Sequence, residues 1–134
     1  MKWIVLILIT IFLSFIFVQY VSIRRLKSKK GQIIDNIDGE LGKILLENKK
    51  LMLYFWTESC RVCKHQTPII LELKDEFKNI FLINLSDEIS IAKKLGIMAV
   101  PTIMLVESRK ILDVMVGAQD INKMKQILLK FYGD

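Results

Sequence analysis

An unbroken apolar run near the N-terminus constrains this chain more than any other feature of its sequence. Trp3–Ile23 consists almost entirely of Ile, Leu, Val and Phe. A helix of about 21 residues, rising about 1.5 Å per residue, matches a hydrocarbon core about 30 Å thick. A cleavable signal peptide would have a shorter apolar region ending at small residues, whereas this run ends at Arg24-Arg25 with no Ala-x-Ala pattern. The sequence therefore predicts one uncleaved transmembrane anchor over residues 1–23, with residues 3–23 in contact with the lipid bilayer.

The basic residues are concentrated beside this apolar run. The formal net charge is +6, and residues 1–30 contain basic residues but no acidic one. Residues 31–134 hold 14 basic and 14 acidic residues, so the rest of the chain is close to neutral. A nucleic-acid-binding domain would concentrate Lys and Arg on its own surface, so we expect no nucleic-acid partner. We interpret residues 24–31 as a basic juxtamembrane linker and residues 32–134 as a separate domain.

The same charges predict the side of the membrane on which the domain lies. Five basic residues follow the apolar run within eight positions, whereas only Lys2 and the amino terminus precede it. The positive-inside rule then places the domain at the cytoplasmic face, where a basic stretch also suits anionic headgroups. The extracytoplasmic face stays open as the alternative.

The remaining sequence alternates between apolar runs of strand length and stretches of helical periodicity. Strand–helix–strand connections of this kind imply parallel pairing, and the last two strands are close enough for an antiparallel hairpin. The predicted fold is α/β, with a mixed central sheet and flanking helices on both faces. The predicted elements are a short strand at 32–34, a helix capped by Asp38 and ending near Lys49, a buried strand at 51–56, a helix from about Cys60 kinked at Pro68, a strand at 80–85, a helix at 89–95 ended by Gly96, strands at 102–106 and 111–116, and a last helix through Ile121, Met124, Leu128 and Phe131.

A Cys-x-x-Cys motif lies where the buried strand at 51–56 gives way to a helix. Cys60 at a helix start would face unpaired backbone N–H groups and the positive end of the helix dipole, which favours its thiolate and lowers the pKa. Arg61 and Lys64 add positive charge and are candidates for tuning that pKa. Cys63, one turn further on, could attack a mixed disulfide formed by Cys60. The motif predicts a redox-active pair.

Other uses of two cysteines fit this sequence less well. Buried structural cysteines would not need this spacing at a strand–helix junction. A zinc site would need carboxylates or a second chain, because the chain has only two Cys and one His. Haem attachment needs Cys-x-x-Cys-His, and here Lys64 separates Cys63 from His65. We therefore expect no metal and no cofactor.

Four short segments in this order resemble the thioredoxin family over residues 31–134. The segments are Phe55–Lys64 with the cysteine pair, Pro68 in the helix that follows, Gly96–Thr102 around Pro101, and Val116-Gly117-Ala118 before the last helix. The resemblance implies a thioredoxin-like fold and a cis Val100–Pro101 peptide packed against the cysteines. It also implies that Val100, Pro101 and Trp56 contact substrate, with Val100 pairing through its backbone. The alternative for Pro101 is a proline at the edge of a sheet.

The sequence departs from the family's pattern at several positions of this site. The family's aromatic residue before the first cysteine is Ser59 here, and its Gly-Pro between the cysteines is Arg61-Val62. Tyr54 takes the place of the family's buried aspartate, and Leu82 lies near the place of that aspartate's lysine partner. What deprotonates Cys63 is therefore open, with Glu58, His65 or water as candidates.

We expect a membrane-anchored thiol–disulfide oxidoreductase that reduces or exchanges disulfides through a Cys60/Cys63 cycle. Its partners would be client proteins carrying disulfides or dithiols, and a thiol reductant or reductase as electron donor. Two alternatives stay open: a redox-inactive docking module for a membrane partner, and a dedicated redox or assembly factor for one metal- or haem-protein client. Client identity and the direction of electron flow are not predicted.

Overall fold

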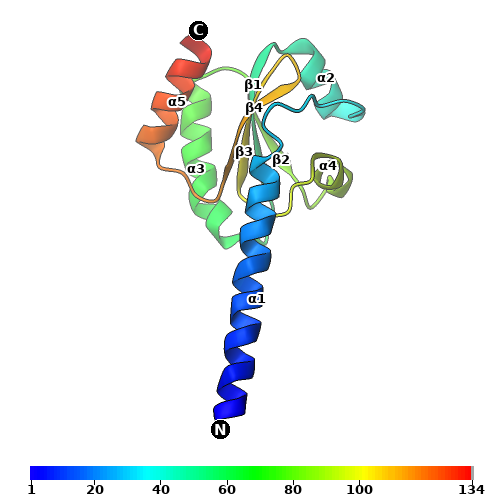
Figure 1. Cartoon of the computed structure of the whole chain (residues 1–134). Helices are drawn as coiled ribbons and strands as arrows, with labels where there is room; N and C mark the ends of the chain where they lie inside the picture. Colours follow the sequence, from blue (N-terminus) through cyan, green and yellow to red (C-terminus); the bar gives the residue numbers. More distant parts are fainter. Residues whose placement is uncertain (134) are drawn as a thin grey trace.

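The buried apolar run of the sequence forms β1, Lys50–Trp56, at the centre of a sheet. In the computed structural model, which describes residues 1–133, β1 forms a sheet with β2 (Ile80–Asn84), β3 (Thr102–Glu107) and β4 (Lys110–Val116). The strands pair in the order β2-β1-β3-β4 (Figure 1). Successive side chains of β1 enter different cores: Leu53 packs on one face of the sheet and Tyr54 on the other, and both are fully buried. A strand covered on both faces is expected to be apolar along its whole length.

The other elements follow the predicted order closely. From β1 onward the order is strand, helix, strand, helix, two strands and a helix, which confirms the prediction. The helix predicted to begin near Cys60 has Cys60 as its N-cap, and Gly96 is the predicted C-cap of the helix at 89–95, in the left-handed conformation at φ 64°. The predicted strand at 32–34 is only an isolated bridge between Ile33 and Lys110. The remaining elements are α1 (Lys2–Lys27), α2 (Gly39–Glu47), α3 (Arg61–Glu76), α4 (Ile89–Leu95) and α5 (Ile121–Gly133).

The prediction of parallel pairing is right for one strand–helix–strand unit and wrong for the other. β1 and β2 are parallel, whereas β3 runs antiparallel to β1 with Thr102 opposite Phe55. α4 has seven residues and rises only about 10 Å, too little to return the chain along a strand of about 17 Å. β3 therefore starts at the edge of the sheet where β1 and β2 end. β3 and β4 form the predicted antiparallel hairpin.

Two helical layers cover the two faces of the sheet. One core lies between the sheet and helices α3 and α5, and includes Leu73 and Leu128. The other lies between the sheet and helices α2 and α4, and includes Leu41 and Leu95. Figure 1 shows α3 and α5 on one side of the sheet and α2 and α4 on the other. The mixed sheet with helices on both faces confirms the predicted fold class.

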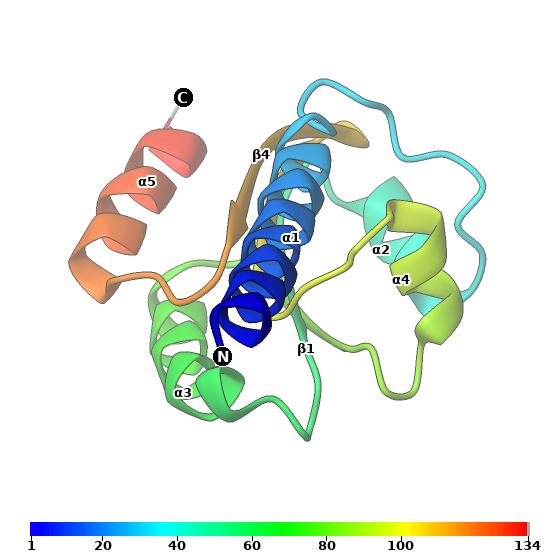
Figure 2. The ribbon, with the colours of Figure 1, turned by 60° about the horizontal axis from the view of Figure 1, so that its bottom comes forward.

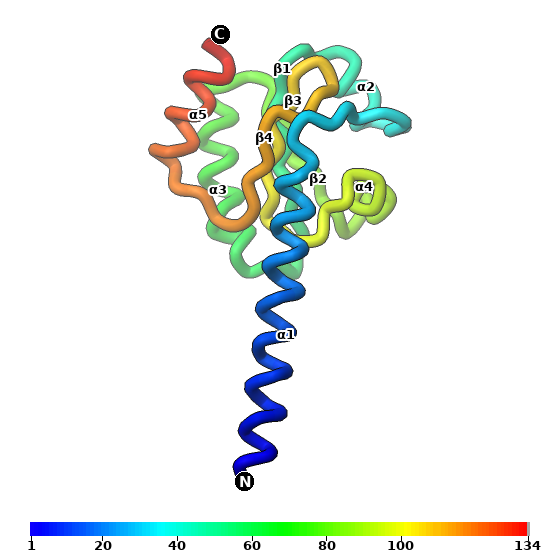
Figure 3. The backbone as a smooth tube through the Cα atoms, viewed as in Figure 1, coloured from blue at the N-terminus to red at the C-terminus, as the bar shows by residue number. Residues whose placement is uncertain are grey.

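The N-terminal helix projects from this domain and joins it without a break. Figure 3 shows α1 extending away from the rest of the chain. α1 is long and apolar enough to span a membrane, with a mean hydropathy of 2.7 over 18 residues that are not buried at all. Residues 24–27, predicted as part of a polar linker, form the last turn of α1. Leu26 in that turn is 0% exposed and belongs to the core shared with α2 and α4. The last turn of α1 is thus an integral part of the folded domain.

Candidate active site

Cys60 lies between the end of β1 and the start of α3. Its backbone N–H donates to the carbonyl oxygen of Thr57 at 3.2 Å, which closes the turn after the strand. Its backbone is extended, at φ −76° and ψ 107°, and it is the N-cap of α3. Its Sγ accepts a hydrogen bond from the backbone N–H of Cys63 at 3.1 Å. The sulfur therefore takes up one of the free N–H groups that begin every helix, at the positive end of the dipole.

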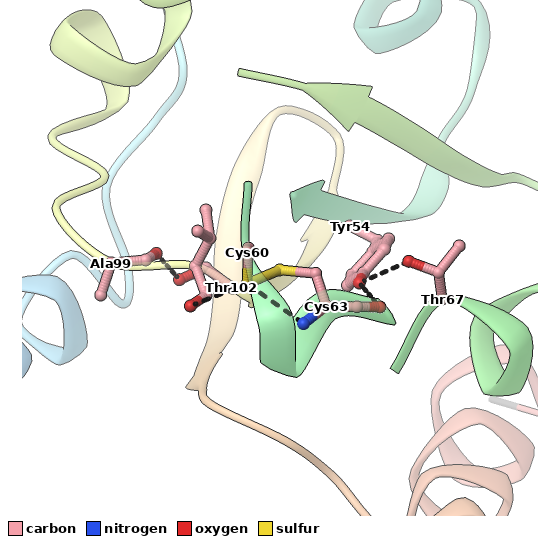
Figure 4. The surroundings of a disulfide bond; sticks show 7 residues. Tyr54, Cys60, Cys63, Thr67, Ala99 and Thr102 are labelled. Carbon is pink, nitrogen blue, oxygen red and sulfur yellow. Dashed lines mark hydrogen bonds between the residues drawn. A yellow bond between two sulfur atoms is a disulfide. The ribbon is translucent and has the colours of Figure 1, made fainter. Parts of the chain in front are cut away.

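Cys60 and Cys63 form a disulfide across the first turn of α3, with their Cα atoms 5.2 Å apart (Figure 4). The two sulfur-bearing residues differ in exposure: Cys63 is 1% exposed, whereas Cys60 is only half-buried. An incoming thiol or disulfide can therefore approach Cys60, while Cys63 is shielded by the protein.

The loop before β3 lies against Cys60. The Val100–Pro101 peptide is cis, as the resemblance implied, and the carbonyl oxygen of Val100 lies 3.7 Å from Cys60 Sγ. Hydrogen bonds fix the loop on both sides: Thr102 Oγ1 donates to Ala99 O at 2.7 Å, and Gly117 N donates to Pro101 O at 2.8 Å. Figure 4 shows Ala99 and Thr102 beside the disulfide. The fold thus brings Val100 and Pro101 to the cysteine pair across about 40 residues of sequence.

Trp56, the last residue of β1, lies next to the buried cysteine. It is half-buried and lines an open cavity of about 380 Å³ next to Cys63. The other lining residues are Thr57, Glu58, Lys64, Thr67 and Pro68. Glu58 therefore lies in the same cavity as the buried cysteine, which keeps it a candidate proton acceptor. The contacts of Trp56 with substrate stay a prediction.

The charged candidates of the first helical turn are exposed to solvent. Arg61, Lys64 and His65 are all exposed, and none of the ion pairs among residues 1–133 includes them. Arg61 and Lys64 add to the positive potential at the start of α3 without contacting an acidic partner. Their pKa-tuning role stays a prediction.

Tyr54 occupies the buried position beneath the cysteines. Its hydroxyl lies 3.0 Å from Thr67 Oγ1 and 3.5 Å from the carbonyl oxygen of Cys63 (Figure 4). Burial raises the pKa of Tyr54 above its ordinary value, although the hydrogen bond with Thr67 acts in the opposite direction. Leu82, the residue near the place of the family's lysine, packs half-buried in the same core. Tyr54 and Leu82 thus stand where the family has a charged pair, and the buried hydroxyl of Tyr54 pairs with Thr67 of α3.

Sequence reasoning missed two residues of this region, Thr67 and Gln66. Thr67 lies one turn after Cys63 in α3. Helical spacing therefore places both residues on the face of the helix that contacts Tyr54, so this contact could have been predicted. Gln66 is 1% exposed, and its Oε1 accepts a hydrogen bond from Gln119 N at 2.7 Å. It ties α3 to the segment before α5, and a polar residue on a helix gave no sign of this contact.

The sheet, the cysteine pair at a helix start and the cis proline beside it define a class of proteins with a redox-active disulfide. Comparison with known proteins gives the family. The model of the family described as Thioredoxin matches residues 31–130. The chain belongs to the thioredoxin family.

Individual relatives agree with this assignment. A thioredoxin of Rickettsia felis is 33% identical over 91 residues, covering 65% of this chain and 87% of that protein. A thioredoxin of Buchnera aphidicola subsp. Schizaphis graminum is 31% identical over 102 residues, covering 73% and 94%. Among solved structures, the reduced thioredoxin pre-protein of Schistosoma mansoni has a TM-score of 0.60 at 29% identity, covering 70% of this chain and 91% of that chain. A mutant thioredoxin of Halobacterium salinarum shares the fold at a TM-score of 0.65 and 21% identity, covering 72% and 86%.

Proposed function

We propose that this protein is a membrane-anchored thiol–disulfide oxidoreductase that reduces or exchanges disulfides in client proteins. The observation that carries the proposal is the unequal exposure of two cysteines joined at the start of α3: Cys60 is accessible and Cys63 is 1% exposed. This difference in exposure supports attack by Cys60 and resolution by Cys63. Membership of the thioredoxin family supports the same reaction.

The reaction follows from these positions. In the reduced protein, the Cys60 thiolate attacks one sulfur of a client disulfide, and the other client sulfur leaves as a thiolate. The Cys63 thiolate then attacks Cys60 Sγ, forms the Cys60–Cys63 disulfide and releases the second client thiolate. The client gains two electrons and the pair loses two. A thiol reductant or reductase then reduces the pair again.

Val100 is the residue that we propose to hold an extended client segment. Its carbonyl oxygen lies 3.7 Å from Cys60 Sγ, so a client backbone that pairs there would place its disulfide beside the attacking sulfur. Because a disulfide sulfur carries no proton, this contact is not a hydrogen bond in the oxidised protein. The reduced thiol could donate to the same oxygen.

The anchor and its orientation are part of the proposal. α1 has the length and hydropathy of a membrane span, and Arg24 and Arg25 directly follow its apolar part. The positive-inside rule favours a domain on the cytoplasmic face. Labelling of reduced Cys60 by an impermeant maleimide tests this orientation. We expect labelling in inside-out vesicles and none in intact cells. Labelling by an impermeant maleimide in intact cells would place the domain outside.

The reaction itself is tested by the reduction potential of the full chain in detergent micelles. Glutathione or dithiothreitol titration with thiol alkylation should give a reversible two-electron couple that Cys60→Ser abolishes. Cys63→Ser should accumulate a mixed disulfide with a disulfide-containing client, whereas Cys60→Ser should not, because Cys63 is buried. Failure of the wild-type pair to form a disulfide would refute the proposal and favour a docking module.

A further inference from the structure

The anchor helix leaves the domain at the end of the sheet that carries the cysteines. We call that end the redox edge: Cys60–Cys63, Met98–Pro101 and Gly117. The strand register places these segments together, because Phe55 pairs with Thr102 and Thr102 pairs with Val116. In Figure 1 and Figure 3, α1 extends beyond the end of the domain where α3 begins. Figure 2, turned so that this end comes forward, shows α1 projecting on the same side as the start of α3.

The contacts that residues 30–33 make along β4 also show the direction in which α1 leaves the domain. Lys30 pairs with Asp113 at 3.9 Å, and Gly31 N donates to Ile111 O at 2.7 Å. Ile33 then bridges to Lys110. As the chain leaves α1 it therefore steps along β4 away from Val116, so the earlier turns of α1 point toward the redox edge and past it.

The junction between helix and domain is fixed by packing. Leu26, the buried residue of α1, is 0% exposed. The helix continues without interruption from Lys2 to Lys27, across the end of the apolar run. The domain consequently has no flexible tether on which to turn relative to the helix, and the direction of the redox edge is coupled to that of the anchor.

The level of the membrane relative to the redox edge follows from the exposure of α1. Side chains are exposed from Met1 to Tyr20, Val21 and Ser22 are the first that are partly buried, and Leu26 is the first that is fully buried. The first charged residue after the apolar run is Arg24, about 5 Å further along the helix. The domain thus begins at the level where the hydrocarbon-compatible part of the helix ends.

The side chains at the redox edge suit a bilayer surface. Met98 is 62% exposed and Val62 is 47% exposed, so both present apolar groups to solvent beside the cysteines. Arg61 and Lys64 add basic groups in the same turn of α3, and basic groups favour anionic headgroups. Glu58 is an acidic residue among them.

From this geometry we propose that the redox edge faces the bilayer surface, and that the clients are cysteine pairs of membrane proteins held at that surface. This inference rests on the proposed function for its chemistry, and the exchange is the one written above. A soluble client would have to enter between the domain and the headgroups to reach Cys60. A membrane protein with a disulfide next to its transmembrane segment already holds that disulfide at the right height.

The orientation can be measured without any redox activity. A nitroxide is placed at Met98→Cys or, as the matched control, at Lys78→Cys in a Cys60→Ser/Cys63→Ser chain reconstituted in vesicles. Lys78 is exposed and precedes β2 at the opposite end of the sheet, about 20 Å away. Collision with a headgroup-bound nickel chelate should be several-fold stronger at residue 98 than at residue 78. Equal or reversed accessibility would overturn the inference.

A second experiment on the orientation keeps both cysteines, in case the Cys60→Ser/Cys63→Ser variant folds poorly. A photo-crosslinking amino acid at residue 98 should capture lipid in vesicles of the wild-type cysteine background, and the same group at residue 78 should not. Lipid capture at residue 78 alone would contradict the proposed direction.

The client class is tested by the height of the disulfide above the membrane. A transmembrane peptide carries a cysteine pair directly at its end, or after rigid helical spacers of about 10 or 20 residues that lift it about 15 or 30 Å. Reduction by the full-length protein in the same vesicles should be fastest without a spacer and slowest with the longest. Inserting ten Gly and Ser residues between Ile23 and Arg24, which gives a reach of about 17 Å, should weaken this dependence. As the control, the same insertion before Lys2 should leave the dependence of the rate on spacer length unchanged.

The outcomes separate the two proposals. Equal rates at all heights, with activity that still needs Cys60, would overturn the inferred client class and leave the oxidoreductase proposal intact. No Cys60-dependent reduction of either these peptides or a soluble disulfide would refute the proposed function, while the nitroxide comparison would still decide the orientation.

Discussion

The hydroxyl of Tyr54 lies 3.0 Å from Thr67 Oγ1, linking β1 to the second turn of α3 beneath the disulfide. The same hydroxyl lies 3.5 Å from the carbonyl oxygen of Cys63. Because burial raises the pKa of Tyr54, the phenol keeps its proton at neutral pH. The pair is therefore a structural support of the buried cysteine and not a base for it.

Replacing Tyr54 by Phe tests this role. The variant loses the hydrogen bonds of the Tyr54 hydroxyl with Thr67 and with the Cys63 carbonyl oxygen, so we expect about 1–2 kcal/mol less stability in both the oxidised and the reduced protein. The pH dependence of disulfide exchange near neutrality should not change. Urea unfolding and stopped-flow exchange measure the two effects, and Thr67→Val completes a double-mutant cycle. A shifted pH profile in Tyr54→Phe would show that the phenol takes part in proton transfer.

Leu26 should contribute to the stability of the domain although it belongs to the anchor helix. Leu26→Ala removes a fully buried side chain, and we expect a loss of about 2–5 kcal/mol in the free energy of unfolding. Leu13→Ala is the control, because Leu13 is exposed in the middle of α1. Urea unfolding of the full chain in micelles compares them. Equal stability of the two variants would show that the last turn of α1 does not pack on the domain in solution.

Arg61 should make the cysteine couple more oxidising. Its positive charge at the start of α3 stabilises a Cys60 thiolate, so Arg61→Gln should move the reduction potential roughly 5–20 mV in the reducing direction. Because Arg61 is exposed, the difference should shrink at high salt. Lys64→Gln provides the comparison at another exposed position in the first turn. An unchanged potential at low salt would mean that the helix N-terminus acts alone.

Tyr132 should make the fold sensitive to alkaline pH. Burial raises the pKa of Tyr132 to about 12, above the value of about 10 in an unfolded chain. The protonated form is favoured in the folded state, so this stability is intact below pH 10 and is lost as the pH rises from about 10 through about 12. After allowing for partial exposure, the loss should be about 1–2 kcal/mol. Measured by urea unfolding between about pH 8 and about pH 11.5, the free energy of unfolding of Tyr132→Phe should fall less steeply with pH than that of the wild type. Equal slopes in the two proteins would contradict a raised pKa of Tyr132.

Gln66 should be needed to hold the segment before α5. Gln66→Met leaves the Gln119 N–H without its 2.7 Å acceptor, and we expect a loss of about 1–3 kcal/mol. Hydrogen exchange at the Gln119 amide should become faster. Gln126→Met, at an exposed position of α5, is the control and should change neither quantity. Unchanged exchange in Gln66→Met would argue against this contact in solution.

Most of the elements and the cysteine pair could be predicted from sequence because their signals are local. The strand β1 is recognised by a continuous apolar run, and α4 ends at a glycine that can take a positive φ. Cys60 was placed at a helix start from the residues on either side of it. The cis peptide at Pro101 was implied by the family resemblance alone, because spacing carries no information on that isomer.

The contacts that complete the site join residues far apart in the chain, and the tertiary structure decided them. Antiparallel β3 depends on where a short α4 releases the chain, and the Val100 contact spans 40 residues. Leu26 follows a membrane-like run and precedes charged residues, so its burial could not be seen in its neighbours. By itself, the sequence determined what each segment tends to form, since helix, strand and cap preferences act over a few residues. Which segments meet, and therefore which way the redox edge points, was decided by the packing of the two cores against one sheet.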